Sequence, residues 1–238
     1  MVKNIFTVRH GEAVHQVDSS IWETCSNCEI PLTPLGKSQS VACGRFFANM
    51  PVKPDTTLII TSPYNRAFQT AEEIIKKTGP LKIVTDQLLV EQNFGMFTGL
   101  STEQCYEKYP VLAKLYDLYA EEYGDYFVKA PKGENKESIV KRAEQFIENT
   151  VPWFKDSKYE NLIIVSHCAI NRAISKVLNN ATPEWFLAQE QQPNGAIRKF
   201  SFLKGKWQDR GFVFIPQNQG SSRTIANPYK LKKKGLEK

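Results

Sequence analysis

The sequence predicts an α/β fold in which helices flank a mostly parallel central sheet. Short apolar runs rich in β-branched residues, such as residues 57–61 and 161–165, have the length and composition of buried strands. Longer stretches between them carry the 3.6-residue apolar repeat of amphipathic helices. Strands that alternate with helices pair in parallel, because each helix returns the chain across one face of the sheet.

The first half of the chain supplies three of the expected strands. Residues 2–8 are apolar and predict a buried strand, after which a polar loop continues to about Pro31. Thr33 and Pro34 have the pattern of an N-cap and a first helical residue, and the helix is expected to end near Asn49. The other elements expected in this half are a strand at 57–61, a helix at 64–77 after Ser62-Pro63, and a strand at 81–84.

The second half begins with a helical region at 101–123 that is expected to break near Pro110. Asn135 is expected to cap a long amphipathic helix. Residues 161–165 form the clearest strand of the chain, and a helix should follow it to about Leu178. The chain is expected to close with a hairpin of strands at 197–203 and 207–215 around Lys204-Gly205-Lys206.

Composition excludes several classes of protein. Of the 238 residues, 41% are hydrophobic and 24% are charged, which is typical of a folded globular chain and not of a disordered one. No apolar run approaches the roughly 18–20 residues of a membrane helix, and the first residues do not form a secretory signal. Five cysteines, an odd number, indicate free thiols in a reducing compartment, so we expect a cytoplasmic protein.

Most of the positive charge lies at the end of the chain. The net charge is +6, and residues 221–238 alone hold six Lys or Arg and one Glu. We therefore expect one catalytic domain over residues 1–220 and a basic C-terminal tail over 221–238. The nearly neutral body is not expected to bind nucleic acid. The tail is interpreted as a solvated terminus, with contact to an acidic partner as the alternative.

Cationic and imidazole side chains follow three of the expected strands. Arg9 and His10 end the first strand, Arg66 follows the second, and His167 follows the strongest. In open α/β sheets, ligands bind beyond the carboxyl ends of the strands, where helix N-termini add further positive potential. Each residue alone has a simpler structural interpretation. Together they predict an anion site, and a phosphoryl group is its natural ligand.

Six ordered stretches of the chain resemble the histidine phosphatase superfamily, in its phosphoglycerate-mutase-like branch. The stretches are Phe6-Thr-Val-Arg-His-Gly-Glu12, Pro31-Leu-Thr-Pro-Leu-Gly36, Thr61-Ser-Pro-Tyr-Asn-Arg-Ala-Phe-Gln-Thr-Ala71, Leu89-Val-Glu-Gln-Asn-Phe-Gly95, Pro131-Lys-Gly-Glu134 and Ile163-Ile-Val-Ser-His167 with Arg172 behind it. This resemblance implies a three-layer sandwich with a mostly parallel central sheet. No metal or cofactor is expected, because Arg9, Arg66 and His167 supply positive charge and no carboxylate cluster suits a two-metal site.

The resemblance also implies roles for individual residues. His10 is expected to be the nucleophile that becomes phosphohistidine, and Glu91 the proton donor. Arg9, Arg66 and His167 are expected to hold the phosphoryl oxygens. Gln16 stands where many members have Asn, and it is carried over as a further phosphate contact.

Two positions depart from the family pattern. Cys168 replaces the usual glycine after the second histidine, which affects the geometry of the phosphate pocket. Thr98 replaces the usual acidic residue, which affects contacts to the leaving group. Separately, Cys25-x-x-Cys28 has the spacing of a zinc or redox pair. Two free thiols in a loop are the preferred interpretation, because no second pair of ligands has matching spacing.

These observations favour a phosphomonoester hydrolase acting on a small phosphorylated substrate. Phosphoglycerate-mutase-type transfer is the alternative, since it uses the same chemistry. It would call for further cationic residues near Glu91, where Gln92 and Asn93 stand instead. A non-catalytic scaffold that binds partners through the tail is the alternative from a different class.

Overall fold

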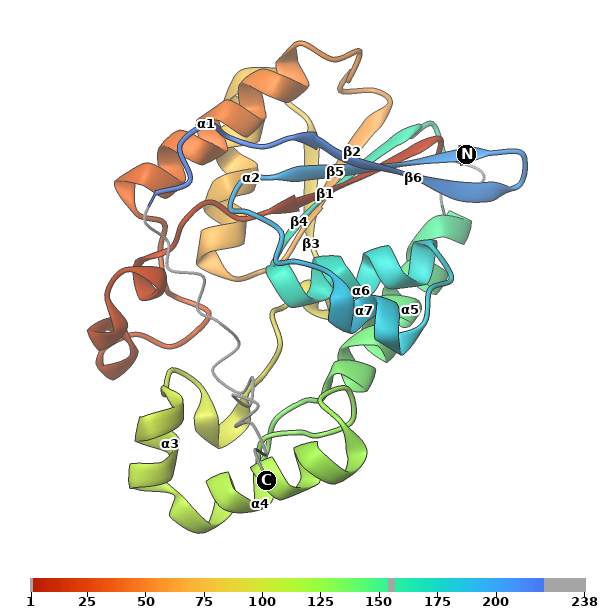
Figure 1. Ribbon diagram of the computed structural model, residues 1–238. Helices are drawn as coiled ribbons and strands as arrows, with labels where there is room; N and C mark the ends of the chain where they lie inside the picture. Colours follow the sequence, from red (N-terminus) through yellow and green to blue (C-terminus); the bar gives the residue numbers. More distant parts are fainter. Residues whose placement is uncertain (1, 154–156, 221–238) are drawn as a thin grey trace.

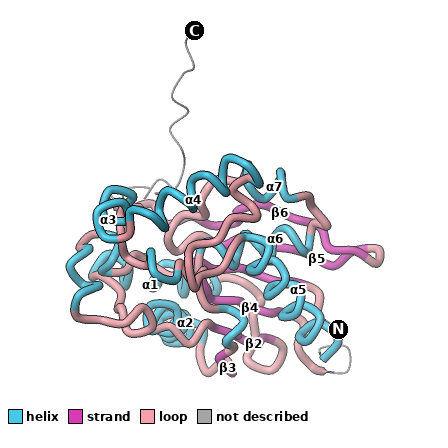
Figure 2. The backbone as a smooth tube through the Cα atoms, turned by 90° about the horizontal axis from the view of Figure 1, so that it is seen from below, coloured by secondary structure: helices cyan, strands magenta, loops and turns pink. Residues whose placement is uncertain are grey.

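The computed structural model describes residues 2–153 and 157–220, and its centre is a sheet of six strands. Four strands at the middle and one edge run parallel: β1 (Asn4–Arg9), β2 (Thr57–Thr61), β3 (Lys82–Thr85) and β4 (Asn161–Ser166). They lie in the order β3-β2-β4-β1. Figure 2 shows the neighbouring strands β3, β2 and β4 from the edge of the sheet inward. The sheet therefore brings β1 and β4 together, although 157 residues separate Asn4 from its partner Asn161.

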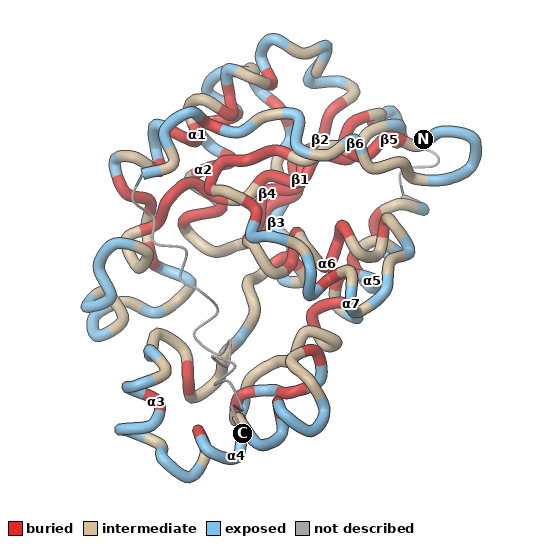
Figure 3. The backbone as a smooth tube through the Cα atoms, viewed as in Figure 1, coloured by how far each residue is buried: buried red, intermediate tan, exposed pale blue. Residues whose placement is uncertain are grey.

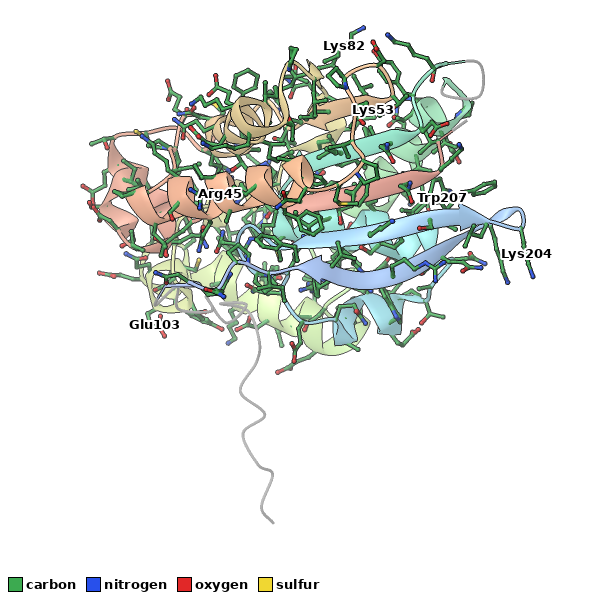
Figure 4. The ribbon with its side chains drawn as sticks, turned by 90° about the horizontal axis from the view of Figure 1, so that it is seen from above. Arg45, Lys53, Lys82, Glu103, Lys204 and Trp207 are labelled. Atoms are coloured by element: carbon green, nitrogen blue, oxygen red, sulfur yellow. The ribbon has the colours of Figure 1, made fainter. Side chains whose placement is uncertain are left out.

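A hairpin completes the other edge of the sheet. Strand β5 (Ile197–Leu203) pairs antiparallel with β1, and β6 (Lys206–Phe214) pairs antiparallel with β5. The tight connection takes Lys204 and Gly205 into positive φ, and Lys204 stands at the exposed tip (Figure 4). The expected mostly parallel sheet and its closing hairpin are thus confirmed.

Helices cover both faces of the sheet (Figure 1). Helices α1 (Pro34–Ala48) and α2 (Asn65–Thr78) lie on one face, and α5 (Lys136–Trp153), α6 (Cys168–Leu178) and α7 (Pro183–Ala188) lie on the other. Successive side chains of β4 point to opposite faces of the sheet and so contribute to two separate apolar cores. Ile163 and Val165 pack toward α1 and α2, whereas Leu162 and Ile164 pack toward α5 and α6. The expected three-layer sandwich is confirmed, and its buried strands stand out in Figure 3.

Helices α3 (Thr102–Lys108) and α4 (Pro110–Tyr123) lie apart from these two layers (Figure 1). They have a small apolar cluster of their own, which includes the buried side chains of Phe97, Cys105 and Ala113. The predicted break at Pro110 is confirmed, because the proline begins α4 at a position where no helical N–H is needed.

Three local details differ from expectation. The segment before Pro31 contains two short 3-10 helices, Val14–Gln16 and Ser19–Glu23. Strand β3 runs over Lys82–Thr85, where its pairing with β2 begins at Lys82, and Leu81 just before it is buried in the core. Helix α7 was not expected, although Thr182 caps it in the same way that Thr33 caps α1. The proposed tail, 221–238, lies outside the described residues.

Candidate active site

The carboxyl ends of β1, β2 and β4 meet at one edge of the sheet. Arg9, the last residue of β1, lies in register with Ser166, the last residue of β4. Two backbone hydrogen bonds extend the strand pairing beyond these ends. His10 N donates to the Ser166 carbonyl oxygen and Ser62 N donates to the Val165 carbonyl oxygen, both at 2.9 Å. This register places the rings of His10 and His167 edge to face, with their centroids 5.1 Å apart.

His10 is buried and its ring is oriented by its own loop. Its Nδ1 lies 2.6 Å from the Gly11 carbonyl oxygen. A carbonyl oxygen can only accept, so Nδ1 carries the hydrogen and Nε2 carries the lone pair in the neutral ring. Burial, followed by the charges of Arg66 and Arg9, lowers the pKa of His10 well below its usual value. His10 is therefore an uncharged imidazole at neutral pH.

His167, whose ring packs against that of His10, is fully buried. Its Nε2 lies 2.8 Å from the Ser62 hydroxyl oxygen, and the Tyr64 ring packs against it with centroids 5.2 Å apart. Its Nδ1 is buried and has no hydrogen-bond partner. Burial and the neighbouring Arg66 charge lower the pKa of His167 well below its usual value.

Two arginines add positive charge to this edge. Arg66, in the first turn of α2, is only 2% exposed, and it donates through Nη1 and Nη2 to the backbone and side-chain oxygens of Asn27 at 2.6 and 3.0 Å. Arg9 donates through Nη1 to the Gln192 carbonyl oxygen at 2.6 Å. Burial lowers the pKa of Arg66 to about 10, so its guanidinium stays charged at neutral pH.

Several of the buried polar nitrogens that lack hydrogen-bond partners belong to residues of this region. In the described part of the chain, Nε of Arg9, Nε of Arg66 and Nδ1 of His167 are all buried and unpaired. Buried polar groups normally have partners, because an unpaired one costs about 1–3 kcal/mol. An anion with several acceptor oxygens would satisfy these nitrogens together.

Glu91 lies beside the same edge, at the N-terminus of α6. Its Oε1 accepts from the backbone N–H of Ala169 at 3.1 Å and from that of Gln92 at 3.0 Å. The positive end of the helix favours a carboxylate at this place. Its negative charge also raises the pKa of Arg66 against the effect of burial, which places the carboxylate within electrostatic reach of the guanidinium.

Gln16 contacts the site through a second amide. The side chains of Gln16 and Asn194 bond to each other at 3.0 and 3.1 Å, and Asn194 Nδ2 also donates to the His10 carbonyl oxygen at 3.0 Å. Gln16 Oε1 accepts from Ala13 N at 2.9 Å as well. Gln16 thus lies close to the loop that begins at His10, with its amide engaged by protein groups.

Sequence reasoning missed three residues of this region. His15 lies near both arginines: burial and their charges lower its pKa to about 3, and its ring packs edge to face on Trp22 with centroids 5.4 Å apart. Its position five residues after His10 was the available indication. Nothing in the sequence indicated Asn27 or Asn194, because loops bring these residues to the site from distant parts of the chain.

The residues that depart from the family pattern take ordinary places. Cys168 begins α6 beside His167 and is half-buried. Thr98 ends a 3-10 helix, Gly95–Phe97. Cys25 and Cys28 are free thiols, and within residues 2–153 and 157–220 no three His, Cys, Asp or Glu side chains form a candidate metal site. No helix in these two ranges is long and apolar enough to cross a bilayer.

Comparison with models of protein families shows which family the chain belongs to. Residues 5–213 match the model of the histidine phosphatase superfamily, branch 1. The chain belongs to this superfamily. The match covers all six strands except the first residue of β1 and the last residue of β6, and it includes all the site residues described above.

Relatives in the histidine phosphatase superfamily include both mutases and proteins named for their likeness to mutases. The chain is 25% identical over 220 residues to phosphoglycerate mutase-like protein AT74 of Arabidopsis thaliana, covering 85% of this chain and 66% of that protein. It therefore spans just under two thirds of that relative's length. It is 26% identical over 200 residues to the 2,3-bisphosphoglycerate-dependent phosphoglycerate mutase of Cytophaga hutchinsonii, covering 82% and 85%.

A solved structure shares the fold over most of both chains. The mycobacterial glucosyl-3-phosphoglycerate phosphatase superposes with a TM-score of 0.69 at 20% identity, covering 88% of this chain and 97% of that one. This similarity confirms the phosphoglycerate-mutase-like three-layer fold predicted from the sequence.

Proposed function

We propose that this protein is a phosphomonoester hydrolase that transfers a phosphoryl group from a small substrate to His10 and then to water. The state of His10 carries the proposal. Its Nδ1 hydrogen is used by the Gly11 carbonyl oxygen, and burial beside two arginines keeps the ring uncharged. Attack on phosphorus needs such an unprotonated imidazole nitrogen, here Nε2.

The reaction has two displacements. In the first, the bond from Nε2 to phosphorus forms while the bond from phosphorus to the leaving-group oxygen breaks. In the second, water attacks phosphorus, the bond to Nε2 breaks, and inorganic phosphate leaves with neutral His10 restored. A covalent intermediate replaces one difficult step by two easier ones.

Arg9, Arg66 and His167 are the proposed contacts to the phosphoryl oxygens, on which transition-state charge accumulates. Their unpaired buried nitrogens support this role. Each such donor is worth roughly 10²–10³ in rate, by analogy with oxyanion holes. Gln16 is a further candidate contact, and it would exchange its bond to Asn194 for one to phosphate.

Glu91 is the proposed proton donor and acceptor. It would protonate the leaving oxygen in the first displacement and take a proton from the attacking water in the second. Its carboxylate accepts from the backbone N–H of Ala169, two residues after His167, which supports a place at the same edge as the proposed phosphoryl contacts. The helix N-terminus and Arg66 favour the charged carboxylate, so Glu91 would first take the proton of a monoprotonated substrate and then give it to the leaving oxygen.

Hydrolysis is favoured over mutase-type transfer by the residues after Glu91. Returning the phosphoryl group to a second hydroxyl calls for a pocket that holds the substrate firmly, but Gln92 and Asn93 are uncharged. Both side chains also have protein partners: Gln92 Nε2 donates to the Glu134 carbonyl oxygen at 3.1 Å, and Asn93 Oδ1 accepts from Gly95 N at 2.8 Å.

The protein's own cations supply the charge stabilisation in this proposal, so no metal ion or cofactor takes part. Activity should survive EDTA, and vanadate should inhibit, because it adopts the five-coordinate geometry of the transition state. Loss of activity in EDTA with recovery on adding Mg²⁺ or Zn²⁺ would contradict the metal-free mechanism.

We also propose a cytoplasmic location, which is supported by five cysteines that are all free.

The decisive variant is His10→Ala. Turnover of p-nitrophenyl phosphate should fall by at least about 10³-fold, with the circular dichroism spectrum unchanged, because His10 lies in a strand-end loop. The wild-type protein, quenched during turnover of ³²P-labelled substrate, should carry acid-labile, base-stable phosphate that the variant lacks. Full activity of His10→Ala would refute the mechanism.

A second assay separates the two reactions of the family. The hydrolase should release inorganic phosphate from small phosphomonoesters and should not interconvert 3- and 2-phosphoglycerate at a comparable rate. Interconversion that outruns phosphate release would instead establish the mutase. A folded protein inactive in both assays would support the scaffold alternative.

A further inference from the structure

The segment that carries Glu91 has little regular structure of its own. It lies between two single-turn 3-10 helices, Gln87–Leu89 and Gly95–Phe97, and is outside the sheet. Carbonyl groups in such a segment must find partners elsewhere in the molecule.

Arg142, in the second turn of α5, supplies most of those partners. Its Nη1 donates to the carbonyl oxygens of Leu88 at 2.8 Å and Val90 at 2.7 Å, and its Nη2 lies 3.5 Å from the carbonyl oxygen of Glu91 itself. The side chain is only 13% exposed. The guanidinium thus holds three carbonyl groups across four successive residues.

Glu134 fixes the arginine and the far end of the segment. Its carboxylate accepts from Nε and Nη2 of Arg142, both at 3.1 Å, and from the backbone N–H of Asn93 at 2.9 Å. Its own N–H donates to the Asn93 carbonyl oxygen at 2.7 Å. The pair Arg142–Glu134, which we call the brace, therefore holds the chain on both sides of Glu91.

We propose that Arg142 is a positioning residue for Glu91, acting through the brace. The inference rests on the proposed function, which gives Glu91 the proton transfers. The carboxylate reaches Ala169 N only if the Glu91 backbone keeps its place, and a displacement of about 1 Å at a reacting group can cost about 10²-fold in rate. A lysine has the same charge but cannot form the planar fork that meets the carbonyls and the carboxylate together.

The variant Arg142→Lys tests the proposal through the leaving group. We expect kcat on an alkyl phosphate to fall by about 10–100-fold, because its alkoxide needs the proton of Glu91. We expect kcat on p-nitrophenyl phosphate, whose leaving group needs little protonation, to change by less than about threefold. Lys141→Met is the matched control, since Lys141 immediately precedes Arg142 on α5 and forms an exposed ion pair with Glu137. It should leave both rates unchanged.

A double-mutant cycle with Glu91→Gln separates positioning from a general structural effect. If Arg142 acts through Glu91, Arg142→Lys should cost less than about twofold in the Glu91→Gln background. Equal losses on both substrates, or additive losses in the cycle, would overturn the proposal. If Arg142→Lys does not fold, Glu134→Gln, which keeps the side-chain shape, should show the same substrate split.

The same data show which idea fails. A wild type without phosphatase activity, or a Glu91→Gln variant without any substrate split, would refute the proposed function. A normal Glu91→Gln split together with an unsplit Arg142→Lys would refute the brace alone.

Discussion

Glu91 accepts one backbone hydrogen bond from its neighbour and one from α6, so a neutral amide at this position would keep the shape of the site. Glu91→Gln should lower kcat on an alkyl phosphate by about 10²–10⁴-fold, the usual contribution of general acid catalysis. The loss on p-nitrophenyl phosphate should be less than about tenfold. Steady-state kinetics with both substrates check this, and equal losses would argue against an acid role.

The three histidines should make the folded state sensitive to acid. The pKa values of His10 and His167 lie well below the usual 6.5, and that of His15 is about 3, in each case chiefly because of burial. As pH falls through 6.5 the unfolded chain binds protons that the folded chain does not. Stability is therefore complete above pH 6.5 and is lost below it, by up to ~1.4 kcal/mol per pH unit for each histidine.

Urea unfolding at pH 7.5, 6.5 and 5.5 measures this loss. His15→Phe should flatten the dependence by about one proton, because it removes one of the three groups. A free energy of unfolding that stays constant from pH 7.5 to 5.5 would show that these rings are protonated in the folded protein.

At the scale of elements, the loop that follows His10 packs closely against the first turn of α1. A Cβ at Gly36 would lie 1.9 Å from the Glu12 carbonyl oxygen, and one at Gly11 would lie 2.2 Å from the Gly36 carbonyl oxygen. Gly36→Ala should therefore destabilise the protein by about 1–3 kcal/mol and weaken phosphate binding, since the loop must move away. Gly205→Ala is the control, because a Cβ added at Gly205, in the β5–β6 turn, would meet open space.

Urea unfolding and inorganic phosphate titration together check the Gly36 variant. Because Gly205 has positive φ, its alanine variant also carries some strain, but it should bind phosphate like the wild type. Normal phosphate affinity in Gly36→Ala would show that the loop tolerates the displacement.

The sequence allowed prediction of those parts of the site that follow buried strands directly. Arg9, His10 and His167 each adjoin an apolar run, and parallel strands must end at a common edge. Asn194 and Asn27 could not be predicted, because their positions depend on how loops pack after the sheet has formed. Helix α7 could have been predicted, since Thr182-Pro183 repeats the cap of α1.

For the molecule as a whole, the untested expectation is the separation of a catalytic body from a basic tail. Residues 221–238 carry six of the 31 Lys and Arg residues, whereas the phosphate contacts proposed here all lie in the first 167 residues. Removing 221–238 should change kcat/KM on a small substrate by less than about twofold, or roughly 0.5 kcal/mol. Kinetics of the full-length and truncated proteins at low and moderate salt check this. A tenfold loss would show that the tail contributes to the pocket.

The position of β1 also governs when the protein becomes active during its synthesis. β1 is made first, yet its two neighbours, β4 and β5, lie more than 150 residues later in the chain. At roughly 5–20 residues per second, a ribosome needs on the order of 10–40 s to reach them. During that time the nascent chain can pair β2 with β3, but both edges of β1 stay open. A polypeptide that ends before β4 therefore contains His10 and both arginines but lacks His167 and the strand that brings them together, so the proposed phosphate site is incomplete.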